Sequence, residues 1–241
     1  MNPSPIDGNV KPTVSSSRVV IRWLVREAMG VILVGLVLFY SAGRLDWVMG
    51  WALVAITTVW VIANALVMIP RNVELLAERL GPQKGAKRWD TILMSFIGLA
   101  VLARLIVAGL DLRFGWTEEI PLGLQTAALV VAVLGYALGV WALAVNSYFS
   151  QIVRIQEERG HQVVTSGPYR FVRHPGYAGT ILFELTVPVM LGSWWAFGLG
   201  VFITILFIIR TTLEDKTLLG ELAGYENYAQ QTSFRLLPGI W

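Results

Sequence analysis

Long apolar runs separated by short polar segments recur along the chain. The first four cover residues 28–42, 47–69, 92–110 and 121–145. A helix that crosses a bilayer needs roughly 20 mostly apolar residues, so this pattern predicts membrane-spanning helices. The run 28–42 is short, but the polar segment before it is too long for a signal peptide, and we expect a retained helix with a helical lead-in.

A fifth apolar run, residues 177–209, is too long for a single span. As one helix it would measure about 50 Å, whereas the hydrocarbon core of a bilayer is about 30 Å thick. Pro188, Gly192 and Ser193 lie near its middle. We therefore expect two shorter helices folded into a hairpin, and an all-α, polytopic membrane bundle of about six transmembrane helices.

The basic residues favour six spans over five. Sixteen of the 19 Lys and Arg fall in the N-terminal tail, the loops 70–91 and 146–176, and the C-terminal tail, which six spans place on one side. With five spans, the C-terminal tail would lie on the other side, and the Lys and Arg outside the spans would divide 13 against five. A re-entrant hairpin in place of the last two spans would leave every polar segment on the same side as six spans do. Cytoplasmic loops carry the excess of Lys and Arg, so both termini are expected in the cytoplasm.

Composition agrees with lipid as the solvent. Hydrophobic residues make up 55% of the 241 and charged residues only 15%, with a mean hydropathy of +0.62. About a quarter of a soluble domain is charged, so an ordinary soluble enzyme is excluded. The absence of cysteine excludes a catalytic thiolate and cysteine-ligated metal sites. The net charge of +3 comes from basic patches beside apolar runs, which predicts a lipid bilayer and no nucleic acid as partner.

The chain divides into three predicted regions. Residues 1–26 form a cytoplasmic tail and lead-in, disordered over 1–17, where Pro, Ser, Gly and Asn are frequent. Residues 27–145 form the N-terminal transmembrane helices. Residues 146–241 contain a long polar loop, the hairpin and a polar C-terminal segment, and we expect the chemistry there.

Two features within the predicted spans leave alternatives open. Gly135 and Gly139 form a GxxxG pattern, which indicates close helix packing either within the chain or in a dimer. Glu184 is a carboxylate inside an apolar run. Such a group is a functional candidate, but pairing with Arg104 or Asn64 is the alternative and is slightly favoured.

Both histidines of the chain, His161 and His174, lie in the loop before the hairpin. The segment HQVVTSGPYRFVRHPGYAG is dense in Gly, Pro and aromatic residues and runs directly into the fifth apolar run. Irregular backbone so close to a membrane is tolerated where it is buried in protein or lines a cavity, which predicts a cytoplasmic ligand pocket. The alternative is a loop anchored among lipid headgroups. Two histidines without helical spacing do not predict a metal site.

A second polar segment follows the hairpin, with the sequence RTTLEDKTLLGELAGYENY. Arg210, Glu214 and Asp215 lie within about a turn and a half and share one helix face. Alone they fit an interfacial helix end with ordinary ion pairs. The hairpin, however, returns them to the side where residues 173–177 lie, so we expect the two segments to form one site.

The motifs GPYRFVRHPGYAG, R-x3-E-D and GYENY, with the hairpin between the first two, resemble the isoprenylcysteine carboxyl methyltransferase family of integral membrane enzymes, which is related to the phospholipid methyltransferases. The likeness covers roughly residues 146–241, and residues 71–80 and 108–114 resemble bacterial members more weakly. The resemblance implies methyl transfer from S-adenosylmethionine to a lipophilic acceptor, a catalytic region at 146–241, and a bacterial inner membrane as the location.

The resemblance also implies the residues of the site. Arg210 matches an arginine at the reaction end, where it is expected to hold an acceptor carboxylate, and Glu214 and Asp215 match the paired acids of the family. Arg210 and Glu214 are the expected catalytic residues. Asp215 departs from the second Glu of the usual pattern. The positions that match the cofactor pocket of the family are His161, Gly167, Tyr169, Arg173, His174, Pro175, Tyr177, Glu214 and Asp215. Within that pocket, Arg173 is expected to bind the carboxylate of the cofactor as a fork, and a tyrosine ring its sulfonium.

Alternatives remain for the reaction. A steroid-reductase-like family uses an RHPxYxGE loop with NADPH, but here Thr180 follows Gly179. A non-catalytic protein that binds lipid headgroups is a third hypothesis. If the acceptor is an amine rather than a carboxylate, a base becomes necessary, and His174 or an acid would take that role.

Overall fold

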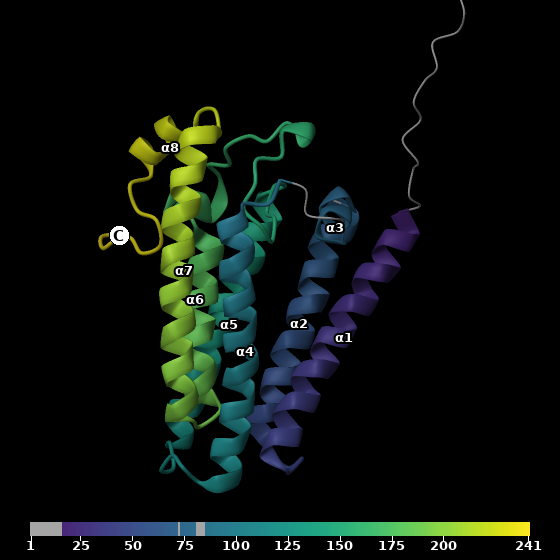
Figure 1. The fold of residues 1–241 in the computed structure, drawn as a ribbon, viewed down its shortest axis with the longest axis vertical. Helices are drawn as coiled ribbons and strands as arrows, with labels where there is room; N and C mark the ends of the chain where they lie inside the picture. Colours follow the sequence, from purple (N-terminus) through teal and green to yellow (C-terminus); the bar gives the residue numbers. More distant parts are fainter. Residues whose placement is uncertain (1–15, 72, 81–84) are drawn as a thin grey trace, which may run out of the picture.

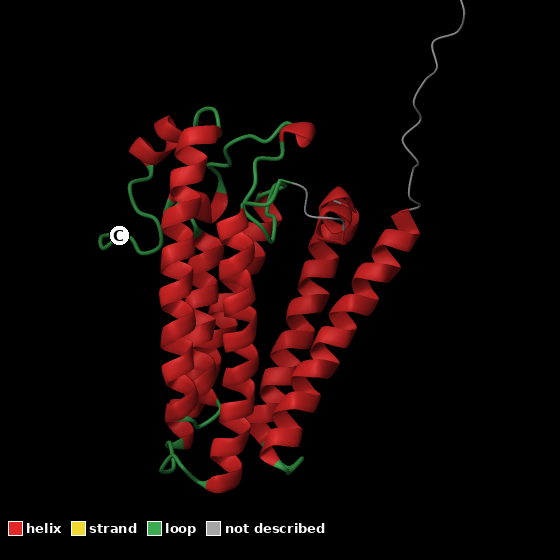
Figure 2. Cartoon of the chain, viewed as in Figure 1, coloured by secondary structure: helices red, strands yellow, loops and turns green. Residues whose placement is uncertain are grey.

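The computed structural model describes residues 16–71, 73–80 and 85–241, and in this part every regular element is a helix (Figures 1 and 2). The predicted all-α class is confirmed, while the expected disordered tail falls largely on residues 1–15, outside the described part. The helices are α1 (Ser16–Ala42), α2 (Val48–Arg71), α3 (Val73–Leu80), α4 (Arg88–Phe114), α5 (Leu122–Val145), α6 (Pro175–Met190), α7 (Trp194–Glu221) and α8 (Tyr225–Gln231).

Five helices of the described part, α1, α2, α4, α5 and α7, are long and apolar enough to cross a membrane. The chain is therefore an integral membrane protein. The remaining predicted crossing, the fifth in chain order, is α6, which has 16 residues and runs beside α7 through the bundle (Figure 1). It is shorter than the others because it begins only at Pro175, after the irregular loop. The short helix α3, which follows α2, was not predicted from the apolar pattern.

The hairpin of α6 and α7 breaks where the sequence predicted. Gly192 adopts a φ of +80°, a left-handed conformation that glycine reaches without steric cost. Ser193 then caps α7 by accepting a hydrogen bond from the N–H of Ala196 at 3.0 Å. The Ser193 hydroxyl also donates to Asp111 near the end of α4, which fixes the hairpin turn to its neighbour.

Glycines bring α5 and α6 into direct backbone contact. A Cβ atom added to Gly179 of α6 would lie 2.3 Å from the carbonyl oxygen of Gly135, and one added to Gly135 would lie 2.6 Å from that of Gly179. Gly139 faces the Trp60 ring of α2 in the same way, at 3.1 Å. The GxxxG pattern thus makes contacts within the chain, the first of the two alternatives.

A buried ion pair connects α4 to α6. Arg104 and Glu184 approach to 2.7 Å and are 2% and 6% exposed. Asn64 instead donates to the carbonyl oxygen of Trp60 in its own helix. Glu184 therefore has the structural partner expected in the second alternative, and it does not line the cavity described below.

The helices α1 and α2 pack against the rest of the bundle at one end and diverge from it at the other (Figure 1). At the packed end, Leu38 of α1 and Leu105 of α4 belong to one buried cluster. At the other end, a separate cluster joins Trp23 of α1 to Leu76 of α3. This second end, where α5 ends and α6 begins, is called the site end below.

We expect Gly179→Ala to destabilise the protein by about 1–3 kcal/mol, because the added methyl group meets a backbone carbonyl that cannot move aside. Thermal unfolding in detergent measures the effect. Gly98→Ala is the matched control, since a Cβ at Gly98 meets nothing within 4 Å. Equal unfolding temperatures for the two variants would contradict the close contact of α5 with α6.

Replacing Glu184 by Gln should cost about 3–5 kcal/mol, because it leaves the Arg104 guanidinium buried without its counter-charge. The double variant Arg104→Met/Glu184→Leu should lose less stability than Arg104→Met alone or Glu184→Leu alone, because it leaves no buried charge unpaired. The exposed pair of Arg44 and Asp46, also at 2.7 Å, serves as the control, and Arg44→Ala should leave the unfolding temperature nearly unchanged. Additive losses in the double variant would argue against a direct pair.

Candidate active site

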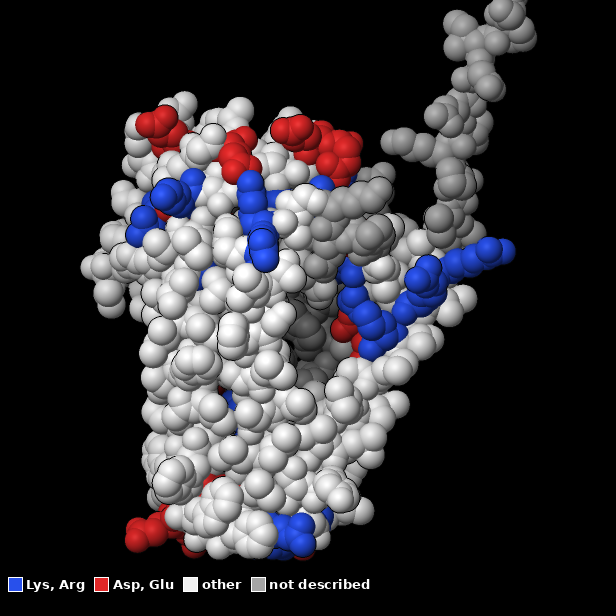
Figure 3. Space-filling model, viewed as in Figure 1, with Lys and Arg blue, Asp and Glu red and all other residues white. Residues whose placement is uncertain are grey.

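A cavity of about 500 Å³ lies at the site end. Small-molecule sites usually measure about 300–1,000 Å³. The loop of residues 146–174, α6 and α7 line one part of it, and α1, α2 and α3 line another. On the face shown in Figure 3, the surface is hollowed beside α1, with basic and acidic side chains at the edge. The predicted loop therefore encloses space for a ligand.

The hairpin brings the two predicted polar segments together, because Arg173 and Asp215 are in direct contact, as are Tyr177 and Glu214. Seven of the predicted site residues line the cavity: His161, Tyr169, Arg173, His174, Tyr177, Arg210 and Glu214. The structure places three others outside the lining: Gly167, Pro175 and Asp215. Pro175 opens α6, Gly167 opens a 3₁₀ turn in the loop, and Asp215 lies behind the cavity wall.

Asp215 is a fully buried carboxylate that gathers four donors. Arg173 donates to both of its oxygens, at 2.8 and 2.9 Å. Arg235 donates to Oδ2 and the Tyr225 hydroxyl to Oδ1, each at 2.9 Å, and His174 Nε2 lies 3.2 Å from Oδ1. A buried carboxylate is stable only when its lone pairs are satisfied in this way. We call these five residues the Asp215 cluster.

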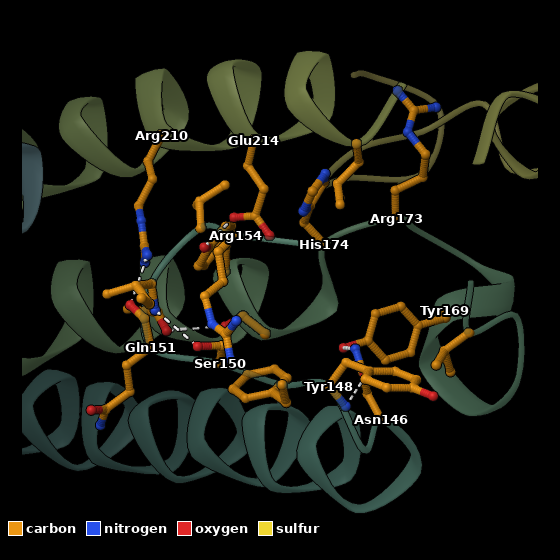
Figure 4. Close-up of a pocket in the computed structure, with 18 of the residues that line it drawn as sticks. Asn146, Tyr148, Ser150, Gln151, Arg154, Tyr169, Arg173, His174, Arg210 and Glu214 are labelled. Atoms are coloured by element: carbon orange, nitrogen blue, oxygen red, sulfur yellow. Dashed lines mark hydrogen bonds between the residues drawn. The ribbon is translucent and has the colours of Figure 1, made fainter. Parts of the chain in front are cut away.

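The C-terminal segment holds the loop through its backbone as well. The N–H groups of Arg173 and His174 donate to the carbonyl oxygens of Phe234 and Arg235, both at 2.9 Å. Arg173 Nη1 donates to the carbonyl oxygen of Thr232 at 2.8 Å. Figure 4 shows the Arg173 side chain turned away from Tyr169 and toward this segment. Its fork therefore holds Asp215 in this structure, and its role toward a cofactor carboxylate stays a prediction.

Glu214 faces the cavity one residue before the buried Asp215. Its Oε2 accepts a hydrogen bond from the Tyr177 hydroxyl, whereas its Oε1 accepts none from the described residues. The Arg210 guanidinium lies 5.0 Å from the centre of the Tyr177 ring. Glu214 is thus a carboxylate with one oxygen available to a cationic or hydroxyl-bearing ligand.

Arg210 has a partner that the sequence analysis missed. Its Nε donates to Oδ1 of Asp90 at 2.7 Å, and its Nη2 donates to the carbonyl oxygen of Gln151 at 2.8 Å. Asp90 is fully buried in the first turn of α4 and also accepts from the N–H of Val153 at 2.7 Å. The only signal in the sequence is an acidic residue among basic ones, directly before an apolar run.

The loop contributes further residues that the sequence analysis did not single out. Asn146 donates to the Tyr169 hydroxyl at 2.9 Å and accepts from the N–H of Tyr148 at 2.8 Å. Arg154 pairs with Glu78 of α3 at 2.6 Å. Asn146 could have been found, because it is a polar residue immediately after an apolar run. The partner of Arg154 could not, because 76 residues separate it from Glu78.

His161 lines the cavity as a neutral side chain. Its Nδ1 accepts a hydrogen bond from the N–H of Gln156 at 3.3 Å, and its ring lies 4.6 Å from that of Tyr148. Burial, together with the nearby positive charges of Arg159 and Arg154, lowers the pKa of His161 to about 4. At neutral pH its ring therefore presents hydrogen-bonding atoms without a charge.

Comparison with known proteins shows where the likeness falls. Residues 127–220 match the model of the isoprenylcysteine carboxyl methyltransferase (ICMT) family. A probable protein-S-isoprenylcysteine O-methyltransferase of Oryza sativa subsp. japonica is 28% identical over 106 residues, 43% of this chain and 56% of that protein. The protein-S-isoprenylcysteine O-methyltransferase of Schizosaccharomyces pombe is 37% identical over 70 residues, 29% of this chain and 30% of that protein. The resemblance found in the sequence motifs is thus confirmed, and the chain aligns with little more than half of the rice relative.

Two further proteins match over longer stretches. The uncharacterized protein YpbQ of Bacillus subtilis is 26% identical over 167 residues, 64% of this chain and 93% of that protein. The solved structure of the eukaryotic intramembrane Ras methyltransferase ICMT superposes with a TM-score of 0.51 at 18% identity and covers 94% of each chain. At this identity, the structural match supports the helical membrane fold.

We expect the free energy of unfolding to fall as the pH drops from about 6.5 toward 4, in part because of His161. In the unfolded chain a histidine takes up a proton near pH 6.5, whereas the folded protein resists protonation until about pH 4. Protons then favour the unfolded state. Thermal unfolding of the wild type and of His161→Asn, recorded from pH 8 to 4, measures this contribution. A wild type that loses no more stability than the variant below pH 6.5 would contradict it.

Proposed function

We propose that the chain, whose residues 127–220 match the model of the isoprenylcysteine carboxyl methyltransferase family, is a membrane enzyme that transfers a methyl group from S-adenosylmethionine to a carboxylate of a lipophilic acceptor. We place both termini in the cytoplasm, because Lys and Arg are concentrated on the side of the site end. We place the protein in a bacterial inner membrane, because residues 71–80 and 108–114 resemble bacterial members of the family.

The observation that carries the proposal is where the family match lies on the structure. The matched residues include most of α5, the whole loop of 146–174, α6, and α7 up to residue 220. These same elements line the polar part of the cavity. The part of the chain that matches the methyltransferase family is thus the part that carries the predicted site residues.

The residues of the cavity fit S-adenosylmethionine by their chemistry. Bound there, this cofactor supplies a methyl group on a cationic sulfur, next to an ammonium and ribose hydroxyls. Glu214 offers a carboxylate oxygen to a cation or a hydroxyl. The rings of Tyr148, Tyr169 and Tyr177 line the same cavity and attract a positive charge placed over their faces. An acceptor for the ammonium or the hydroxyls, and aromatic faces for the sulfonium, are therefore present.

A carboxylate acceptor needs no general base, because it carries no proton to remove. The protein then contributes by aligning the reacting atoms and by keeping water away from the nucleophile. The Asp215 cluster fixes the end of the loop at His174, directly before α6, the helix that carries Tyr177. Asp90 fixes the Arg210 side chain over the Tyr177 ring. The rigid placement of these groups is what the reaction requires of the chain.

A lipophilic acceptor also needs a way into the site from the membrane. The part of the cavity between α1, α2 and α3 is lined by Trp23, Trp60 and Val61, among others. The hollow beside α1 in Figure 3 lies on the same side. An apolar tail in this part of the cavity would place its polar end near the loop of residues 146–174.

The detergent-purified protein should be stabilised by S-adenosylmethionine and by S-adenosylhomocysteine, by about 2.7 kcal/mol at a hundredfold excess over the dissociation constant. Glu214→Gln should weaken this binding about tenfold or more, since it removes a charge-assisted hydrogen bond. The exposed Glu226 gives the matched control, because Glu226→Gln should bind as the wild type does. A thermal-shift titration measures all three proteins.

The same titration includes NADPH as a competing cofactor. Stabilisation by NADPH and by neither adenosyl compound would contradict a methyltransferase and favour the reductase hypothesis. Binding of S-adenosylmethionine that is unaffected by Glu214→Gln would leave the cofactor in place and remove Glu214 from the site.

A further inference from the structure

The part of the cavity between α1, α2 and α3 contains polar groups that the proposed reaction leaves without a role. Arg79 of α3, Trp23 and Glu27 of α1, and Asn64 of α2 all line it. A pocket for an apolar tail alone would need none of them. Their presence indicates that a polar group of a ligand lies here as well.

Arginines of the cavity differ in whether the protein supplies their counter-charge. Three of the four hold a carboxylate: Arg154 holds Glu78, Arg173 holds Asp215, and Arg210 holds Asp90. Arg79 forms no ion pair with any described residue. Its Nη2 donates to the carbonyl oxygen of Phe149 at 3.1 Å, its guanidinium lies 6.0 Å from the centre of the Phe149 ring, and its buried Nε has no acceptor.

The acids that act on Arg79 do not neutralise it, because Glu78 is paired with Arg154 and Glu27 with Arg26. Glu27 accepts two hydrogen bonds from Arg26, which in turn donates to the carbonyl oxygen of Arg79 at 2.7 Å. One carboxylate thus faces two guanidinium groups. Burial lowers the pKa of Arg79 to about 10, so at neutral pH it remains a cation, with a surplus positive charge around it. Buried charges in proteins are normally paired.

Trp23 provides a second unused donor on the same side. It is 1% exposed, and its indole Nε1 is buried without an acceptor. Buried N–H groups are nearly always hydrogen-bonded. An indole N–H and a guanidinium that both lack acceptors, on the wall of one cavity, match the needs of an oxyanion.

We propose that Arg79 and Trp23 form an oxyanion site for the end of an amphiphilic ligand whose apolar chain lies between α1, α2 and α3. The shared chemistry is a negatively charged oxygen group on an apolar chain. If the ligand is the methyl acceptor, the group is the carboxylate to be methylated, and this part of the inference rests on the proposed function. An anionic phospholipid is the other source of the same chemistry.

The test compares two forms of one probe, N-acetyl-S-farnesylcysteine with its free carboxylate and its neutral methyl ester, against the full-length protein in nanodiscs. Arg79→Gln keeps a donor for the Phe149 carbonyl and removes the charge, while Trp23→Phe removes only the indole N–H and part of the ring. Each should weaken binding of the acid about tenfold or more and leave the ester unchanged. Arg22→Gln, at an exposed arginine of α1 outside the cavity, should bind both forms as the wild type does.

A parallel arm replaces phosphatidylcholine by phosphatidylglycerol in the nanodiscs. Stabilisation by phosphatidylglycerol that Arg79→Gln and Trp23→Phe abolish would support the oxyanion site with a phospholipid as its source. Should Arg79→Gln fail to fold, Trp23→Phe and Arg79→Lys give the same comparison, and Arg79→Lys should retain part of the preference for the acid.

Three outcomes would overturn the site. The first is that neither Arg79→Gln nor Trp23→Phe changes the binding of the acid or the stabilisation by phosphatidylglycerol. The second is equal loss of acid and ester, which would mean that the two residues only shape the cavity. The third is loss of S-adenosylmethionine binding in Arg79→Gln, which would assign Arg79 to the cofactor. If the wild type binds no S-adenosylmethionine, the proposed function fails, while the difference between acid and ester still decides on the oxyanion site.

Discussion

The site depends on one buried carboxylate. Asp215 connects a helix of the bundle, the loop before the hairpin and the C-terminal segment, because Arg173, His174 and Arg235 all meet it at hydrogen-bond distance. A loop of irregular backbone at the edge of a membrane has many polar groups to satisfy. In residues 173–175 (the RHP segment), the Asp215 cluster binds the side chains of Arg173 and His174, and the C-terminal segment accepts hydrogen bonds from their N–H groups. Glu214, the residue before Asp215, is thereby held toward the cavity, where one of its oxygens is available to a ligand.

The cavity combines two different electrostatic arrangements. On the side of α7, arginines and carboxylates of the protein neutralise one another, and the polar atoms left for a ligand are few and fixed. On the side of α3, the positive charge exceeds the negative charge of the described residues. The side of α7, which is preorganised and neutral, suits a zwitterionic cofactor. The side of α3, which lacks an anion, suits a ligand that carries a negative charge. The two halves are continuous, as a transfer between two bound molecules requires.

Local features of the sequence determined which parts could be predicted. The length of the run 177–209, interrupted by Gly192 and Ser193, predicted the hairpin, and the hairpin predicted the contact of the RHP segment with Glu214 and Asp215. These inferences depend only on helix rise and bilayer thickness. Pairings such as Arg210 with Asp90, 120 residues apart, leave no periodic signal. For the same reason, the sequence could not show whether the fork of Arg173 faces a ligand or a carboxylate of the protein.

The buried pair of Arg104 and Glu184 also has a consequence for how the chain is assembled. Arg104 belongs to α4, and its partner is made only after α5 and the long loop have been synthesised. A lone arginine at this depth is costly in lipid. We therefore expect α4 to remain beside the insertion machinery, or against α1, until α6 arrives. The order of translation would then delay the release of the first helices into the bilayer.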